Sequence, residues 1–407
     1  MNTLFQNLMG WVDDRFPATK MWEEHLSKYY APKNFNFWYF FGSLALLVLV
    51  IQILTGIWLT MNYKTDATLA FGSVEYIMRD VEWGWLIRYM HSTGASMFFV
   101  VVYLHMFRGL IYGSYRKPRE LIWIFGMFIY VALMAEAFLG YLLPWGQMSY
   151  WGAQVIISLF GAIPFGIGEA LAEWIRGDFV VSDATLNRFV AFHVIALPIV
   201  LLGLVVAHII ALHEVGSNNP DGVEIKKNKD ENGIPRDGIP FHPYYTVKDI
   251  FGVGVFLIIF ALIVFYAPAM GGWFLEAANF IPADPLTTPE HIVPLWYFTP
   301  FYAILRAVPD KLMGVIGMGG AIVMLFLLPW LDRGKVKSIR YRGPIFKAAI
   351  IIFAISFVVL GYLGTQPASG VYVILARICS VLYFAFFILM PWYSKIDKTK
   401  PEPERVT

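Results

Sequence analysis

The chain has 407 residues, of which 58% are hydrophobic and 15% are charged, and its formal net charge is +2. A soluble domain carries roughly a quarter charged residues, so this much apolar surface requires a lipid bilayer to cover it. The near-neutral charge gives no indication of a nucleic-acid partner. The single cysteine, Cys379, excludes an internal disulfide, a cysteine-built zinc site and a covalently attached c-type haem.

Residues 1–33 interleave charged and aromatic side chains without a continuous apolar core, which is not the pattern of a signal peptide. We expect an interfacial helix here, lying on the membrane surface. Eight apolar segments follow, each close to the roughly 20 residues that a bilayer crossing requires. They lie near 36–60, 86–111, 121–142, 188–212, 250–268, 312–331, 345–364 and 372–392.

The distribution of basic residues predicts the orientation. Of the 31 Lys and Arg residues, 22 fall in the N-terminal segment, the C-terminal tail and the second, fourth and sixth loops. Because basic loops stay on the cytoplasmic side, both termini are predicted to face the cytoplasm, or the matrix of an organelle. The two longest loops, 143–187 and 269–311, then lie on the opposite, positive side.

Four of the eight histidines lie inside two apolar segments. His91 and His105 are fourteen residues apart in the second segment, and His193 and His208 are fifteen apart in the fourth. At 3.6 residues per turn, a spacing of fourteen keeps two side chains on similar faces and about 21 Å apart along the axis. His91 can then face His193 near the positive side, and His105 can face His208 near the cytoplasmic side. Two bis-histidine sites are what two non-covalent b haems require.

The spacing of fifteen is an irregularity, because it rotates the helix face by about 60° in the other direction. Pro198 lies between His193 and His208, so we expect a kink or a one-residue bulge to correct the rotation. A single histidine in a membrane helix is often only a packing residue. Four histidines at matched spacings on parallel helices argue against that interpretation.

Glycines in the first and third segments repeat the histidine spacing, with Gly42 and Gly56 fourteen residues apart, as are Gly126 and Gly140. Small residues make room for a flat macrocycle, although helix packing alone also selects them. Gln52 faces the same interior and can contact a haem edge. The sequence therefore predicts haem contacts on four helices.

Two arginines lie three residues from histidines of the second segment. Arg88 precedes His91 and Arg108 follows His105. A guanidinium group matches the geometry of a haem propionate, and a charge at such depth is costly unless it is paired. The alternative is that each arginine extends to a lipid headgroup.

Together these features predict an all-α integral membrane protein with eight transmembrane helices, the first four forming a dihaem four-helix bundle. The bundle is expected over 34–215, followed by a cytoplasmic loop over 216–249. A C-terminal four-helix region over 250–395 and a polar tail over 396–407 complete the prediction.

Five stretches resemble cytochrome b of the quinol–cytochrome c reductase complex, in its bacterial respiratory form. They are RYMHSTGASMFFVVVYLH (88–105), PWGQMSYWG (144–152), HEVGSNNP (213–220), HPYYTVKD (242–249) and DPLTTPEHIVPLWYFTPFYAILR (284–306). The resemblance extends over nearly the whole chain, and all eight segments occur in one polypeptide. It implies a protonmotive quinone cycle in which ubiquinone is the expected quinone. It also implies a multi-pass protein of the bacterial inner membrane, with both termini in the cytoplasm.

The resemblance also implies two quinone sites. Quinol oxidation near the positive side would use Tyr141, Met148, Gly152, Pro294, Tyr297, Phe298 and Tyr302. Quinone reduction near the cytoplasmic side would use His213, Ser217, Lys248 and Asp249, among which His213 and Asp249 can supply protons. The implied partners are a Rieske-type iron–sulfur protein, a membrane-anchored c-type cytochrome and a second copy of the complex.

The sequence departs from the family at 294–297. The family usually has Pro-Glu-Trp-Tyr there, and the glutamate is proposed to accept a quinol proton, whereas this chain has Leu295. Candidate replacements in the same loop are Glu290, Asp284 and His291, and a further candidate is Glu136 in the middle of the third segment. The competing interpretations are loop solvation for Glu290 and a structural hydrogen bond for Glu136.

Two other classes of protein remain open at this point. A dihaem membrane anchor of a formate dehydrogenase or hydrogenase also pairs histidines, but typically on fewer helices and without a long quinol-site loop. A transporter or channel would account for Glu136 but not for the coincidence of the histidine and glycine spacings.

Overall fold

The computed structural model describes residues 3–407. Within this range eight helices are long and apolar enough to cross a membrane, which confirms the predicted number. These spans are Phe37–Thr60, Gly84–Tyr112, Glu120–Leu142, Asp183–Val215, Phe241–Tyr266, Lys311–Leu331, Pro344–Leu363 and Gly370–Ile388.

The spans correspond to α3 (Phe40–Thr60), α5 (Gly84–Tyr112), α6 (Glu120–Leu142), α9 (Asp183–Ala191) continued by α10 (Leu197–Val215), α11 (Thr246–Tyr266), α13 (Lys311–Leu331), α14 (Pro344–Leu363) and α15 (Gly370–Ile388). The shorter helices are α1 (Thr3–Asp13), α2 (Ala18–Trp22), α4 (Ala70–Arg79), α7 (Gln147–Phe160), α8 (Ile167–Arg176), α12 (Thr299–Ala307) and α16 (Met390–Ile396). Two short strands, β1 (Tyr30–Pro32) and β2 (Gly238–Pro240), pair antiparallel.

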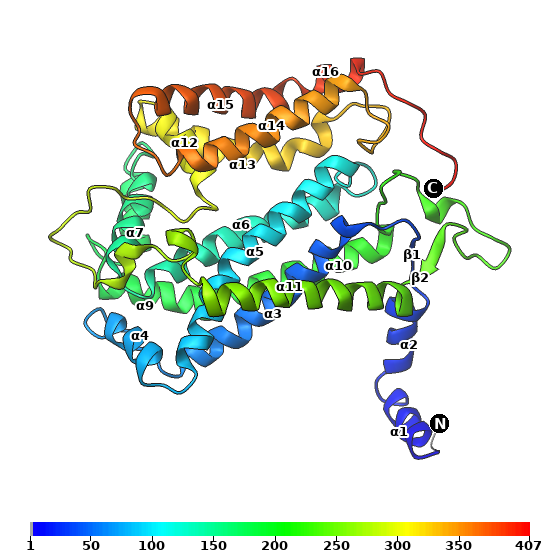
Figure 1. The fold of residues 1–407 in the computed structure, drawn as a ribbon, viewed down its shortest axis with the longest axis horizontal. Coiled ribbons are helices and arrows are strands. Elements are labelled where there is room, and N and C mark those ends of the chain that lie inside the picture. Colours follow the sequence, from blue (N-terminus) through cyan, green and yellow to red (C-terminus); the bar gives the residue numbers. More distant parts are fainter. Residues whose placement is uncertain (1–2) are drawn as a thin grey trace.

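The first four spans form two closely packed helix pairs, α3 with α5 and α6 with α10 (Figure 1). Within residues 3–407 the two pairs touch each other only sparsely. His91 and His105 of α5 face His193 and His208 of the fourth span across this seam. This arrangement suits a bound group held between the α3–α5 pair and the α6–α10 pair.

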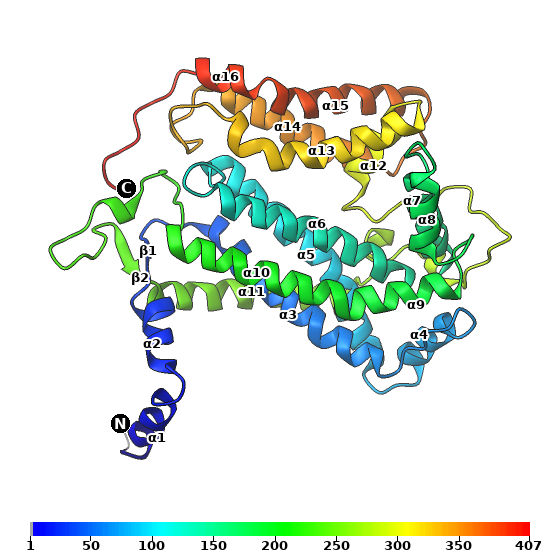
Figure 2. The ribbon, with the colours of Figure 1, turned by 180° about the vertical axis from the view of Figure 1, so that it is seen from behind.

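The remaining spans do not form one group. α11 packs against α3 and α5, so it belongs to the first layer, whereas α13, α14 and α15 pack together with α12 in a separate layer (Figures 1 and 2). The expected four-helix region over 250–395 is therefore three spans plus the short α12. α11 instead packs on the bundle, where its own side chains Phe256, Phe260 and Val264 are buried in the apolar core.

The two ends of the molecule differ (Figure 1). One end, which we call the loop end, carries α4, α7, α8, α12 and the long segments 143–187 and 269–311. The other, which we call the terminus end, carries the N-terminal segment, the C-terminus and the β1–β2 pair. The histidine pair His91–His193 is nearer the loop end, and His105–His208 is nearer the terminus end.

The N-terminal segment is not the single interfacial helix that 1–33 predicted. Its described part consists of α1, α2, a π-helical turn at Glu23–Ser27 and strand β1, while residues 1 and 2 lie outside the described range. Pairing of β1 with β2 explains the difference, because it fixes the end of this segment to the loop that precedes α11.

Asp237, beside β2, fastens both termini to this loop. Its carboxylate accepts hydrogen bonds from Arg405 at 2.7 and 2.9 Å and from the Val406 amide at 3.1 Å, and Lys33 lies 3.1 Å away. The Arg405 hydrogen bonds are the main reason that the pKa of Asp237 is lowered to about 2.

The fourth span contains the predicted bulge. A π-helical turn at Phe192–Ala196 joins α9 to α10, and Pro198 follows at the start of α10. A π turn accommodates one extra residue within a helix. It therefore returns His193 and His208 to the same face despite their spacing of fifteen.

Candidate cofactor sites in the bundle

The four helical histidines form two facing pairs, as predicted. The ring centres of His91 and His193 are 6.2 Å apart with planes at 86°, and those of His105 and His208 are 6.4 Å apart with planes at 62°. A metal–imidazole bond is about 2 Å long, so one ion held between two facing ring nitrogens places the ring centres about 6 Å apart. Both pairs therefore have the separation that a bis-histidine iron requires.

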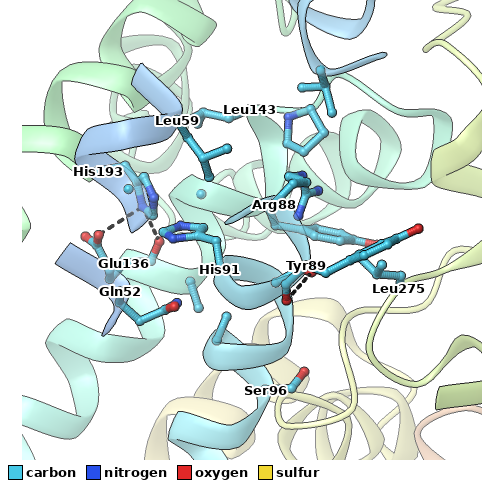
Figure 3. A pocket seen from close by; sticks show the side chains of 18 of the residues that line it. Gln52, Leu59, Arg88, Tyr89, His91, Ser96, Glu136, Leu143, His193 and Leu275 are labelled. Atoms are coloured by element: carbon cyan, nitrogen blue, oxygen red, sulfur yellow. Dashed lines mark hydrogen bonds and ion pairs between the residues drawn. The ribbon is translucent and has the colours of Figure 1, made fainter. Parts of the chain in front are cut away.

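The outer nitrogens of the first pair are bonded to protein. His91 Nδ1 lies 2.9 Å from Thr55 Oγ1, and His193 Nδ1 lies 2.9 Å from the backbone oxygen of Glu136 and 3.0 Å from its Oε1. An imidazole that donates its Nδ1 proton to oxygen keeps Nε2 free for a metal. Figure 3 shows His193 between Glu136 and His91.

The second pair has different neighbours. His105 Nδ1 lies 3.3 Å from Nη2 of Arg108, a group that can only donate. His208 lies against the backbone of Ile122, but its Nδ1 has no hydrogen-bond partner among the described residues. The two sites thus share their histidine geometry and differ in what surrounds it.

Each predicted glycine lies against one imidazole. A Cβ built on Gly42 would lie 3.2 Å from Cε1 of His105, one on Gly56 would lie 3.2 Å from Cε1 of His91, and one on Gly126 would lie 3.5 Å from Cε1 of His208. At Gly140 the added atom would overlap the ring of His193. The glycines therefore clear space for the ligand rings, and their contact with a macrocycle remains a prediction.

A cavity of about 510 Å³ opens beside the His91–His193 pair. Its volume lies in the range of cofactor and ligand sites. Among its lining residues are six that the sequence singled out as haem contacts or ligands: Gln52, Gly56, Arg88, His91, Gly140 and His193. Figure 3 shows the side chains of Arg88 and Gln52 at this cavity.

Buried polar atoms near the two pairs lack partners among residues 3–407. They include Gln52 Oε1, Glu136 Oε2 and Arg108 Nε, while the guanidinium of Arg108 lies over the ring of Tyr39 at 4.8 Å. Unpaired buried polar groups are costly, so they indicate a missing polar partner. Arg88 and Arg108 suit haem propionates, and the residues present fit a haem at each pair.

Part of the predicted quinol-oxidation group lines the same cavity. Tyr141 and Tyr297 do so, together with Leu295. The ring of Tyr297 stacks on Phe99 at 3.8 Å and 7°, and its backbone oxygen accepts a hydrogen bond from Tyr103 at 2.6 Å. These contacts fix the 294–297 segment against the bundle.

The other members of that group do not line the cavity. Met148 and Gly152 are buried in α7, and Gly152 faces Tyr141, since an added Cβ would lie 3.9 Å from Tyr141 Cε1. Pro294 and Phe298 precede α12, and Tyr302 lies within it. Among the candidate proton acceptors, Glu136 lines the cavity, whereas Glu290 is exposed on the loop and does not.

Two cavity residues were missed from the sequence. Asn279 donates a hydrogen bond to the Tyr141 hydroxyl at 2.8 Å and accepts one from the Ser149 amide at 2.8 Å, which ties the 269–311 loop to α6 and α7. Glu276, three residues earlier, also lines the cavity, and burial raises the pKa of its carboxyl. Only their place in a long loop beside the expected site could have suggested them.

The predicted quinone-reduction group gathers at the terminus end. Tyr29 stacks on His213 at 4.5 Å and 24° and also lies against Ser217, and His25 Nδ1 lies 3.3 Å from His213 Nδ1. Sequence reasoning missed His25 and Tyr29, because the N-terminal segment reaches this site only through the pairing of β1 with β2.

Lys248 and Asp249 belong to the first turn of α11, not to a loop over 216–249 as the sequence suggested. The Lys248 ammonium lies 5.0 Å from the ring centre of Tyr245, and Asp249 lies against Ser43 of α3. Both residues are therefore anchored by helices at the same end of the bundle as His213.

The fold and the two histidine pairs define a multi-pass membrane haem protein. Residues 26–216 match the family described as cytochrome b/b6/petB, and residues 282–384 match cytochrome b(C-terminal)/b6/petD. A cytochrome b of Allochromatium vinosum is 67% identical over 98% of both chains, and one of Solanum tuberosum is 46% identical over 95% of this chain and 94% of its own. A solved chain of a hyperthermophilic respiratory complex III superposes with a TM-score of 0.87 at 40% identity, covering 95% of this chain and 98% of that chain. The chain belongs to the cytochrome b family.

Proposed function

We propose that this chain holds two b haems, one at each histidine pair, and couples quinol oxidation at the loop end to quinone reduction at the terminus end. As a cytochrome b, it is a haem-binding electron-transfer protein and the core subunit of a quinol–cytochrome c reductase. The observation that carries the proposal is the cavity at the loop end, which joins the His91–His193 pair to Tyr297 and Leu295. This common cavity is not explained by the transporter or anchor interpretations.

When bound, the haems supply one-electron transfer, which quinol oxidation and quinone reduction both need. The protein supplies position and protons. Tyr141 and Tyr297 give the cavity aromatic walls, and Asn279 holds Tyr141 and α7 in register. These side chains bind a flat quinol ring and exclude water from it.

Quinol oxidation also needs proton acceptors, and Leu295 cannot serve. Glu276 and Glu136 both line the cavity, whereas Glu290 lies outside it. The raised pKa of Glu276 brings that carboxyl closer to neutral pH, where general bases are most effective. We assign the first proton to Glu276, whose loop position also gives a short route to water, and retain Glu136 as the second candidate.

At the terminus end, His213 and Asp249 are the proposed proton donors to a reduced quinone, with Lys248 and Ser217 as polar partners. Tyr29 and His25 cover His213 and are added to this group. The chemistry of the group supports reduction, because each quinone carbonyl gains a proton as it gains electrons.

The proposed setting follows from the expected quinone cycle. The electron acceptors are a Rieske-type iron–sulfur protein and a membrane-anchored c-type cytochrome, the quinone is ubiquinone, and the complex is a homodimer. The chain is placed in the bacterial inner membrane with both termini in the cytoplasm. The 22 basic residues at the terminus end support this orientation.

The test is a reduced-minus-oxidised spectrum of the purified complex, with haem measured per chain, followed by quinol-dependent reduction of cytochrome c. We expect two b haems per chain and quinol-dependent turnover. A complex that contains no b haem, or one whose haems are not reduced by quinol, would contradict the proposal.

A further inference from the structure

The layer formed by α12, α13, α14 and α15 contains a second cavity, which shares no lining residue with the cavity beside His91. It has a volume of about 490 Å³ and lies between α13 and α15, with the last residues of α12 along it. Both long helices are membrane spans, and Val381 and Ile388 on the α15 wall are exposed. The cavity is therefore a groove that opens sideways into the lipid.

The groove is long and narrow. Its α15 wall extends from Arg377 to Ile388, which is about 16 Å of helix. Half of the hydrocarbon core of a bilayer is about 15 Å thick, so the groove has the length of one lipid chain. Its volume over that length gives a mean cross-section of about 30 Å², whereas a helix about 10 Å across needs about 80 Å². A hydrocarbon chain therefore fits the groove, and a further transmembrane helix does not.

Among the lining residues Arg377 alone is charged, and it lies toward the loop end of the groove. α15 begins at the loop end, and helical side chains lean toward the N-terminus of their helix (Figure 1). The Arg377 Nε donates a hydrogen bond to the backbone oxygen of Ala307 at 2.9 Å. Ala307 lies four residues before Lys311, where the α13 span begins. The guanidinium group is therefore near the depth of the lipid headgroups.

The protein leaves most of this guanidinium group unpaired. The bond to Ala307, at the end of α12, uses one of its five N–H donors. Within residues 3–407 the exposed Arg377 has no other hydrogen bond and no carboxylate within 4 Å. By contrast, the neighbouring Arg306 donates two hydrogen bonds to backbone oxygens at 363–364. A charge on a membrane span is costly unless it is paired, so Arg377 needs an anion from outside the chain.

The rest of the groove is apolar. The one other polar side chain among its lining residues, Ser380, donates its hydroxyl proton to the Ala376 oxygen at 2.6 Å. Beyond it the α15 wall continues with Phe384, Ala385 and Ile388. Lipid chains are as apolar as these side chains, so burial alone does not select a ligand in a membrane. Selection comes from the cation at one end of the groove.

We propose that this groove binds one phospholipid of the leaflet at the loop end, with its phosphate paired to Arg377 and one acyl chain along α15. A guanidinium group matches the geometry of a phosphate and binds it through charge-assisted hydrogen bonds. The phosphate supplies the missing anion, and the chain occupies the apolar space between α13 and α15. The site lies outside the bundle, so it requires neither a haem nor a quinone.

The test uses the intact complex in phospholipid vesicles that contain a small fraction of phosphatidylglycerol with a photoreactive diazirine on one acyl chain. One probe carries the diazirine near the ester carbonyl and the other carries it at the end of the chain. After illumination, labelled residues are identified by mass spectrometry. We expect the first probe to label Ser380 and Val381 and the second to label Ile388. Ile374 and Ile378, which are exposed on α15 outside the groove, should be labelled much less.

Two variants separate the roles of the cation and the groove. Arg377→Leu should lower labelling in the groove about tenfold, because it removes hydrogen bonds from a charged donor, and Arg377→Lys should retain part of it. Ala385→Phe obstructs the groove but keeps the cation, so it should remove labelling by the chain-end probe. Lys311→Gln is the matched control, since it removes a cation at a similar depth outside the groove and should change nothing. Haem content per chain checks that each variant is folded.

Equal labelling of the groove and of the outer face of α15 would overturn the proposal. Unchanged labelling in both Arg377→Leu and Ala385→Phe would do the same. Displacement of the probe by excess ubiquinone, but not by excess phosphatidylglycerol, would also overturn it and assign the groove to a quinone chain. If a variant does not assemble, the comparison of the two probes in the unmodified complex still decides between a seated chain and ordinary lipid contact.

Discussion

The His91–His193 and His105–His208 sites have nearly the same ring separation, 6.2 and 6.4 Å, yet their surroundings are opposite in character. One site opens onto a cavity and bonds its imidazoles to oxygen atoms. At the other, the cationic Arg108 lies beside His105 and over the ring of Tyr39. The comparison shows that helix periodicity sets the separation of the two imidazoles in each pair, whereas the neighbouring side chains set the polarity and charge around them.

The largest expected effect is loss of one ligand. His193→Leu or His208→Leu should each remove one haem and leave the other, because each pair is held by separate residues. Haem content per chain measured against the unmodified complex checks this result. If either variant lost both haems or neither, the two sites would not be independent.

Replacing the two α6 glycines by alanine should affect the two haems unequally. Gly140→Ala places a methyl group in the ring of His193, whereas Gly126→Ala places one 3.5 Å from His208, which is ordinary contact. We expect Gly140→Ala to lose most of the loop-end haem and Gly126→Ala to retain both. Haem content and the difference spectrum of each variant measure the contrast, and equal losses would contradict it.

Glu276 and Glu290 lie in the same loop, but only Glu276 lines the cavity, so only its substitution should change the pH dependence of quinol oxidation. The raised pKa of Glu276 means that the base is lost as pH falls through that value, so quinol oxidation should decline on the acidic side. Glu276→Gln should lower the rate by at least about tenfold and abolish this acidic limb, since general bases contribute about 10²–10⁴. Rates are compared across pH.

The matched control is Glu290→Gln, which changes an exposed residue outside the cavity and should leave the profile unaltered. An unchanged acidic limb in Glu276→Gln would remove Glu276 from the proton route. A lost limb in Glu290→Gln would return the loop glutamate to it.

The smallest effect is expected at Thr55. Thr55→Val removes the acceptor of His91 Nδ1 while keeping the shape, at a cost of about 1 kcal/mol for the lost hydrogen bond. The potential of the loop-end haem should rise slightly, because an imidazole that loses its hydrogen-bond acceptor becomes a less electron-rich ligand. Redox titration of the variant beside the unmodified complex measures the shift, and an unchanged potential would contradict it.

Helix periodicity made the spans, the histidine pairs and the glycine positions predictable, because spacing along a rigid helix fixes the face of each residue. The loop contributions were not predictable. Asn279 bonds Tyr141 across 138 residues, and His25 reaches His213 across 188, through loop and strand contacts that leave no periodic trace. For the same reason Glu276 could not be predicted from the sequence, whereas Glu290, which lies nearer the 294–297 segment, was predicted.

The π turn at Phe192–Ala196 adds one residue to the fourth span without adding a helical turn. The interval from His193 to His208 is therefore one residue longer than the interval from His91 to His105, yet it contains the same number of turns. A chain shortened by Val194 would lose the wide turn, bring its two imidazole-bearing positions to the interval found in α5, and keep both on the seam. The seam constrains the direction in which each side chain points, so the deletion of one residue here can be absorbed without moving either histidine off the seam.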